Sequence, residues 1–481
     1  MQLWHLRRRV HVSWMIALGC LFFVAGVWAA QYSSLSPWWF GGAAILAWLG
    51  FWNRKVLVLP VVILAGLIAG MCYGSIVSSN LGVYEQLVGV PLSIEGRVKE
   101  DLSTTAKGLS VLQLDRIRYE NNDLPGSVWV SVLGHPAAKR GDIVTVSGKT
   151  TEGFGTFALT LFTAKVTSVV HPEPGDIGRK FRDWFADAIR KEIPEPEASL
   201  GVGYLTGQKS ALPPDLATAL QIAGLSHVVV ASGYNLTILV RLARRLFIRF
   251  SKFLSVFGSG LMIAGFISLT GLSPSMTRAG LVSGLSLATW YYGRNFHPFV
   301  LLPFAAAITV LWQPSYAWGD LGWQLSFAAF AAVMIVGPLL QRYFFGEKEP
   351  GTIRQVLGET VAAHIVTIPI VVPAFGYISN VAIPANILIV PLVPIAMLLT
   401  FIVGITALGI PSIVEVVGIP VTWLLHYMTF TAQYLAGLPW AKTTLVTPWW
   451  LVLAYTVLLI AGCVYMQRKT GFQLREVNII E

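Results

Sequence analysis

Charged residues are scarce in this chain of 481 residues. Only 12% of the residues are Asp, Glu, Lys or Arg, whereas 55% are hydrophobic and the mean hydropathy is +0.65. An ordinary soluble domain carries about 25% charged residues, so the composition excludes that class of protein. Together with 17 tryptophans, it is typical of a polytopic α-helical membrane protein.

Cysteine is almost absent. Cys20, Cys72 and Cys463 each lie in an apolar run with no second cysteine nearby. A disulfide framework or a thiolate metal site needs cysteines in closely spaced sets. We therefore interpret all three as small hydrophobic residues.

The sequence also lacks the Gly-x-x-x-x-Gly-Lys-[Ser/Thr] loop. In many NTPases that loop holds the phosphates of the nucleotide. Nucleotide binding and hydrolysis by that route are excluded.

The chain contains many long apolar runs. Twelve of them approach the length of about 20 residues that a helical crossing needs. They cover residues 12–30, 38–52, 56–78, 225–247, 253–271, 274–293, 298–313, 320–341, 356–375, 383–409, 412–437 and 448–466. If each run crosses once, basic segments such as Arg7–Arg9 and Gln467–Lys469 fall on the cytoplasmic side. We expect about twelve transmembrane helices, an uncleaved first helix and both termini in the cytoplasm.

The expected organisation follows from these runs. It comprises N-terminal transmembrane helices (1–80), an extracytoplasmic β-domain (90–172), an amphipathic interfacial helix (175–195), a second transmembrane domain (196–466) and a cytoplasmic tail (467–481). In the helix at 175–195, Phe181, Trp184, Phe185, Ala188 and Ile189 share one face, with charges elsewhere. Such a helix is predicted to lie on the membrane surface.

Between residues 90 and 172 the pattern changes to short alternating segments separated by Gly, Pro, Asn and Asp. About five strands in 80 residues favour a small closed barrel such as the OB-fold, with a β-sandwich as the alternative. Trp129, Phe154 and Phe157 are candidates for stacking on the bases of a single strand, although Trp129 could equally belong to the barrel core. Nine basic and eight acidic residues between 91 and 170 predict weak phosphate binding.

Polar groups interrupt the apolar run that begins near residue 225. His227, Ser232, Gly233 and Asn235 lie there, and Arg278 follows a proline break in a later run. Buried polar groups need a partner or a water-filled path. A packed histidine, a small-residue helix contact at Ser232 and Gly233, and carbonyl capping by Arg278 are the structural alternatives.

These segments resemble the ComEC family of DNA-uptake proteins. The resemblance rests on Ser226-His227, Ala231–Gly233, Thr270–Ala279, Gly322–Phe327, Phe375–Ser379 and Pro384–Pro394, in that order. It implies a channel in the bacterial inner membrane for single-stranded DNA, with an OB-like domain. It adds Gln324, Ser326 and Asn386 to the polar candidates, of which Asn386, like Asn235, could also belong to a structural network.

The resemblance also implies partners. A cytoplasmic DNA-translocating ATPase and a surface DNA receptor are expected, while a separate nuclease and self-association are left open. The sequence departs from the family in two ways. Asn235 stands where a second histidine is usual, and the eight scattered histidines contain no His-x-His-x-Asp-His cluster of a metallo-β-lactamase-like nuclease. We therefore expect no enzyme activity, cofactor or metal.

Two other classes of function remain open from the sequence. A secondary transporter for a small anionic solute could use Arg278 at a helix broken by proline. An intramembrane hydrolase with Ser232 as nucleophile and His227 as base is disfavoured. Five residues along a helix place these side chains about 140° apart.

Overall fold

The computed structural model describes residues 10–472, except 54, 105–108, 121, 135, 209–211, 230–232, 272, 294–297 and 347–350. The chain forms two compact units. The first comprises Met1–Gly175 and Phe296–Gln324, and the second comprises Asp176–Asn295 and Leu325–Glu481.

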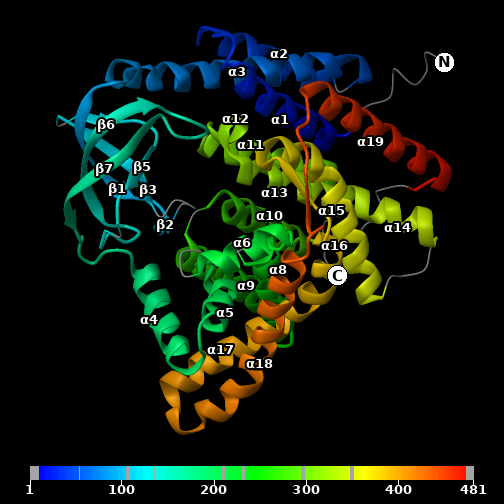
Figure 1. The fold of residues 1–481 in the computed structure, drawn as a ribbon. Coiled ribbons are helices and arrows are strands. Elements are labelled where there is room, and N and C mark those ends of the chain that lie inside the picture. The colour runs from blue at the N-terminus through cyan, green and yellow to red at the C-terminus, as the bar shows by residue number, and fades with distance from the viewer. Residues whose placement is uncertain are drawn as a thin grey trace. The chain divides into compact units, whose positions relative to one another are not determined.

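Closely packed helices form the membrane-like part of the first unit. They are α1 (Val12–Ala29), α2 (Trp39–Asn53), α3 (Leu59–Leu81), α11 (Pro298–Trp312) and the short α12 (Tyr316–Gly319), with 3₁₀ turns η2 (Val56–Val58) and η3 (Gly82–Leu87). Helix α3 packs on α1 and α2, and α1 also packs on α11 (Figure 1).

Glycines set the distance between α1 and α3. Gly66, Gly70 and Gly74 recur every four residues and face α1. A Cβ atom on Gly70 would overlap the carbonyl oxygen of Phe23, and one on Gly66 would overlap that of Gly19. Close backbone approach of this kind is how apolar helices gain packing energy in a membrane, where no hydrophobic effect drives them together.

A closed β-barrel completes the first unit. Its strands are β1 (Pro91–Val98), β2 (Ser103–Thr104), β3 (Ser110–Tyr119), β4 (Asn122–Leu124), β5 (Val128–Val132), β6 (Ile143–Glu152) and β7 (Leu159–Val170). The ring runs β1-β6-β7-β5-β3 and closes by pairing of β3 with β1; only β5 and β7 are parallel. Alternation along β1 buries Leu92, Ile94 and Val98 inside it. The predicted small barrel is confirmed.

The second unit is almost entirely helical. It contains α4 (Ile177–Glu192), α5 (Glu197–Thr206), α6 (Pro214–Ile222), α7 (Ser226–Val229), α8 (Gly233–Phe247), α9 (Lys252–Thr270), α10 (Pro274–Tyr291), α14 (Gly337–Phe345), α15 (Thr352–Phe375), α16 (Ala382–Ile389), α17 (Val393–Gly409), α18 (Pro411–Ala436) and α19 (Trp449–Thr470). Helix α13 (Leu321–Ala331), whose first residues belong to the first unit, leads through a π-helical turn (Ala332–Val336) into α14. A 3₁₀ turn (Val390–Leu392) joins α16 to α17, and the strands β8 (Tyr377–Ser379) and β9 (Lys442–Thr444) pair.

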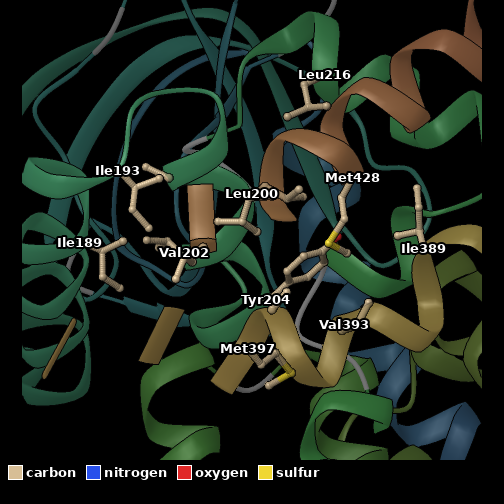
Figure 2. Close-up of a cluster of buried hydrophobic side chains, with 14 of the residues drawn as sticks. Ile189, Ile193, Leu200, Val202, Tyr204, Leu216, Ile389, Val393, Met397 and Met428 are labelled. Atoms are coloured by element: carbon tan, nitrogen blue, oxygen red, sulfur yellow. The ribbon is translucent and has the colours of Figure 1, made fainter. Parts of the chain in front are cut away.

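The core of the second unit lies where α5 meets α17 and α18. Leu200 and Tyr204 of α5 point toward Val393, Met397 and Met428 (Figure 2). Each of these side chains is at most 3% exposed. At roughly 1.5–3 kcal/mol for each large apolar side chain, this burial holds the short helix α5 in place.

Helix α4 buries only part of the apolar face predicted for it. Phe185 packs in the core, with its ring 5.9 Å from that of Phe401, and Ile189 is fully buried. Phe181 and Trp184 remain about half exposed, at 52% and 53%. Contact of α4 with a membrane surface stays a prediction, and it would involve the exposed side chains of Phe181 and Trp184.

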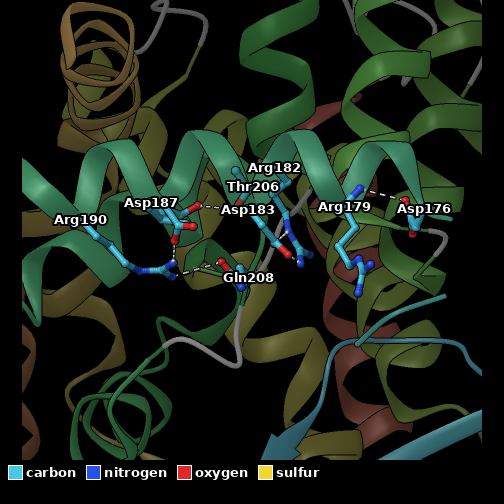
Figure 3. Close-up of polar contacts among 9 residues, drawn as sticks. Asp176, Arg179, Arg182, Asp183, Asp187, Arg190, Thr206 and Gln208 are labelled. Carbon is cyan, nitrogen blue, oxygen red and sulfur yellow. Dashed lines mark hydrogen bonds and ion pairs between the residues drawn. The ribbon is translucent and has the colours of Figure 1, made fainter. Parts of the chain in front are cut away.

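Charges of α4 are also buried. Asp176 caps the helix by accepting a hydrogen bond from the backbone N–H of Arg179 at 2.8 Å (Figure 3). Arg182 is 2% exposed and its Nη2 lies 2.9 Å from Asp183 Oδ1. Such burial is tolerated because the guanidinium has a carboxylate partner.

Eight stretches of the described chain are long and apolar enough to cross a membrane. They are Val12–Ala29, Val56–Leu87, Lys252–Thr270, Leu321–Phe345, Ile353–Phe375, Ala382–Gly409, Ser412–Ala436 and Trp449–Thr470. Helices α2 and α11 have only 15 residues each, and α8 carries three arginines. Eight of the twelve crossings expected from the sequence are therefore supported by helix length and composition, and the other four remain a prediction.

We predict that Gly70→Leu lowers the thermal stability of the detergent-purified protein. The added side chain cannot fit against the α1 backbone, and overpacking costs about 1–3 kcal/mol or more. Gly41→Leu on α2 is the matched control, because a Cβ there meets no atom within 4 Å. Equal melting temperatures for the two variants would contradict this account of the α1–α3 contact.

Candidate functional site

Arg278 is buried inside the apolar second unit. Helix α10 begins at Pro274 after an N-cap in which Ser273 Oγ accepts from the Met276 backbone N–H, and Arg278 lies one turn further on. Only 9% of its surface is exposed. Proline at the first helical position and the Ser273 cap explain why α10 begins here. Arg278 therefore lies inside the helix and not in the loop before it.

Two aromatic rings of α13 lie against the Arg278 guanidinium. Its Cζ lies 5.2 Å from the ring centre of Phe330 and 5.8 Å from that of Phe327, both on α13. Stacking on aromatic faces contributes about 0.5–2 kcal/mol per contact. These contacts position the guanidinium plane but supply no negative charge.

Hydrogen bonding leaves Arg278 incompletely satisfied. Within the described part of the chain, its Nε is buried and has no hydrogen-bond partner. Helices α8, α9, α10 and α13 contain no Asp or Glu. A buried guanidinium without a carboxylate is costly, which favours an anion from outside the chain as its partner.

Gly233 lets this arrangement form. It is the first residue of α8, and a Cβ atom there would lie 3.2 Å from Arg278 Nη2 and 3.2 Å from Ala279 Cβ. A side chain at this position would force the guanidinium or Ala279 to shift by a few tenths of an ångström. The N-terminal end of α8 therefore lies beside the same cation, and the positive end of a helix dipole also attracts negative charge.

Asn235 is a structural residue next to this site. It is fully buried, and its Nδ2 donates to the Tyr204 carbonyl oxygen at 3.0 Å. The bond ties the start of α8 to α5 and so fixes the position of Gly233. This agrees with the structural-network alternative.

The other polar candidates are not joined to Arg278 by any described contact. His227 is exposed, and its Nδ1 lies 3.0 Å from the Gly224 carbonyl oxygen, a local contact within one turn. Asn386 is buried and donates to the Ala382 carbonyl oxygen at 2.7 Å within α16. Gln324 and Ser326 are half-buried on α13. Ser232 lies outside the described residues.

Phe327 and Phe330 are site residues that were not singled out from the sequence. Phe327 belongs to the Gly322–Phe327 segment that carries part of the resemblance, and Phe330 follows three residues later on the same helix face. The spacing of two aromatic residues at i and i+3 was the available signal. Nothing in the sequence indicated that they would face an arginine 50 residues earlier.

A second candidate surface lies on the outside of the barrel. Trp129 is half-buried between inward-facing Val128 and Val130, so it is not a core residue. Its ring centre lies 5.5 Å from Phe154 and 5.4 Å from Phe162, and Phe154 lies 5.6 Å from Phe157. The three predicted aromatics are brought together.

Phe162 is the fourth ring of this aromatic cluster, and the sequence did not single it out. It is 51% exposed at an irregularity of β7, where Thr163 adopts a positive φ of 51°. A regular strand would alternate its faces. Leu159 and Leu161 point into the barrel, so alternation places Phe162 on the outer face, and the pairing of β5 with β7 brings it beside Trp129.

Comparison with known proteins places the chain in a family. A model described as "Competence protein" matches residues 204–469. The "ComE operon protein 3" of Bacillus subtilis (strain 168) is 22% identical over 222 residues, which cover 46% of this chain and only 28% of that relative. No solved structure matches. With its apolar helices, this chain is a multi-pass membrane protein that belongs to the competence protein family.

Proposed function

We propose that this chain takes part in DNA uptake and conducts single-stranded DNA through its second unit. The printed names of the family and of the Bacillus subtilis relative support a role in competence. The observation that carries the proposal is Arg278, a buried cation with an unsatisfied Nε and no acidic residue on the helices that surround it. A nucleic acid backbone is a chain of anions, which such a site attracts.

The finer architecture belongs to the same proposal. We infer twelve crossings, cytoplasmic termini and a barrel outside the cytoplasm in a bacterial inner membrane. We also assign the barrel to the OB class. Its five ring strands, numbered along the chain, follow the order 1-2-3-5-4 with strands 3 and 5 parallel. The exposed aromatic cluster fits base stacking on its outer surface.

The proposed protein is a conduit and not an enzyme. Among the described residues, no group of three or more His, Cys, Asp or Glu side chains is placed to hold a metal ion. In this proposal a cytoplasmic ATPase supplies the driving force and a surface receptor captures the DNA, with a separate nuclease as a possible third partner.

Arg278→Gln should lower uptake of labelled DNA at least about tenfold, because loss of one charge-assisted contact costs about 1.5–3 kcal/mol. Membrane abundance should stay near wild type, because glutamine can still pack against the rings of Phe327 and Phe330. Arg278→Lys should give intermediate uptake, because lysine keeps the charge but not the planar fork.

Arg354→Gln is the matched control for this experiment. Arg354 also stacks on a ring, Phe345 at 4.8 Å, but it is exposed. Normal uptake by a stable Arg278→Gln protein would refute the conduit role of Arg278. If the wild type binds a small labelled anion and Arg278→Gln abolishes that binding but leaves DNA uptake unchanged, the result would instead support a solute transporter.

The orientation of the barrel is tested by thiol labelling. In a cysteine-free background, Asn122→Cys on the exposed β4 should react with a membrane-impermeant maleimide in spheroplasts before lysis. Lys469→Cys near the end of α19 should react only after lysis. The reverse pattern would invert the proposed topology.

The absence of nuclease activity is tested with the purified protein. Single-stranded and duplex DNA should remain intact with Mn²⁺ or Mg²⁺, because two-metal hydrolysis needs a preformed ligand cluster. Cleavage that co-purifies with the chain through a second affinity step would show that the protein is an enzyme.

A further inference from the structure

A dense group of cations lies where α8 passes into α9. We call this group the basic turn, and it consists of Arg241, Arg244, Arg245, Arg249 and Lys252. Arg244 is half-buried and the other four are exposed. Five positive charges within twelve residues repel one another, so the arrangement is costly unless an anion approaches it.

The helices that form and flank the basic turn provide no acidic residue to neutralise it. Helix α4, which carries Asp183 and Asp187, also packs on α9, but its Gly178 lies against Ser268 near the opposite end of α9. Helices α8 and α9 pack on each other, and α10 packs on both. None of the three contains an acidic residue, and the sequence has no Asp or Glu anywhere from residue 216 to residue 319. The excess of Lys and Arg that is usual in cytoplasmic loops of membrane proteins explains why the basic turn is positive. It does not explain why acidic residues are missing from the whole surrounding segment.

Two of the cations lie over the same aromatic ring. Arg244 Cζ lies 5.3 Å and Lys252 Nζ 5.4 Å from the ring centre of Trp290, and Lys252 Nζ lies 5.6 Å from that of Tyr291. Cations stacked on a ring lose freedom before any ligand arrives, which lowers the entropy cost of binding. Trp and Tyr are also the residues enriched where a protein crosses the headgroup layer.

Apolar side chains next to the cations decide which anion fits. Leu246, Phe250 and Phe253 are 55%, 79% and 67% exposed, and Lys252 is the first residue of a stretch that can span the membrane. A single strand would meet Phe250 and Phe253 only through stacking of its bases, and Leu246 has no ring for such stacking. A phospholipid offers a phosphate to the cations and acyl chains to the neighbouring apolar residues.

We propose that the basic turn is a binding site for anionic phospholipid headgroups. Arg245 and Arg249 contact the phosphate directly, because both are exposed. Arg244 and Lys252 are held by Trp290 and form the floor of the site. The site would fix the depth of the α8–α9 hairpin in the membrane, and it does not depend on the proposed role in DNA uptake.

Native mass spectrometry of the full chain in detergent tests this site by titration with phosphatidylglycerol. Arg245→Gln with Arg249→Gln should weaken binding about 25-fold, since each cation near an anionic lipid contributes roughly a fivefold gain in affinity. Lys149→Gln with Lys165→Gln removes the same charge from exposed barrel residues and should leave lipid binding unchanged. Trp290→Leu, which keeps every charge, should weaken binding about two- to fivefold.

Three results would overturn the proposal. One is unchanged affinity for phosphatidylglycerol in the Arg245 and Arg249 double variant. Another is equal binding of phosphatidylcholine and phosphatidylglycerol by the wild type. The third is loss of binding to a single-stranded oligonucleotide in the double variant while lipid binding persists, which would assign the cations to DNA.

Discussion

A hydrocarbon environment offers no hydrogen-bond partner and no counterion, and the rest of this structure depends on that constraint. In the first unit, α3 uses Gly66, Gly70 and Gly74 to approach the α1 backbone, so that close packing holds the helices together. In the second unit, every buried polar group has to find its partner within the chain. Asn235 and Asn386 do so through backbone carbonyls.

Arg278 is a charged residue for which this solution is incomplete among the described residues. Two phenylalanine rings and the open space at Gly233 accommodate its guanidinium, yet its buried Nε has no partner in the described part of the chain. Arg182 shows the contrast, because it is buried more deeply but contacts Asp183. Under the proposed function, the anion that reaches this partly satisfied guanidinium is the backbone of the transported strand.

The sequence predicted those features that depend on periodicity and composition. Alternation along residues 91–98 and the Gly- and Asp-rich turns were sufficient to predict a small barrel. Long apolar runs were sufficient to predict most of the long helices. Features set by tertiary packing were not predictable. Arg182 lies on a helix face that looks solvent-exposed, Phe162 meets Trp129 only because β5 pairs with β7, and Phe330 reaches Arg278 only through folding.

Among the polar candidates, the sequence could not separate functional from structural roles. His227 and Asn386 stand out equally in an apolar run, but their contacts are to nearby backbone carbonyls. Gly233 was singled out with Ser232 as a small-residue contact, and the structure shows that its value is the space it leaves for a guanidinium. Chemical type marks a residue as unusual, while its neighbours in space decide what it does.

Photo-crosslinking during transport tests the central claim most directly. A benzoylphenylalanine at Phe330, beside Arg278, should crosslink to labelled single-stranded DNA that is arrested during uptake. The same residue at Trp423, which is 75% exposed on α18, should not. Uptake-competent protein that crosslinks to DNA at Trp423 but never at Phe330 would contradict a DNA path past Arg278.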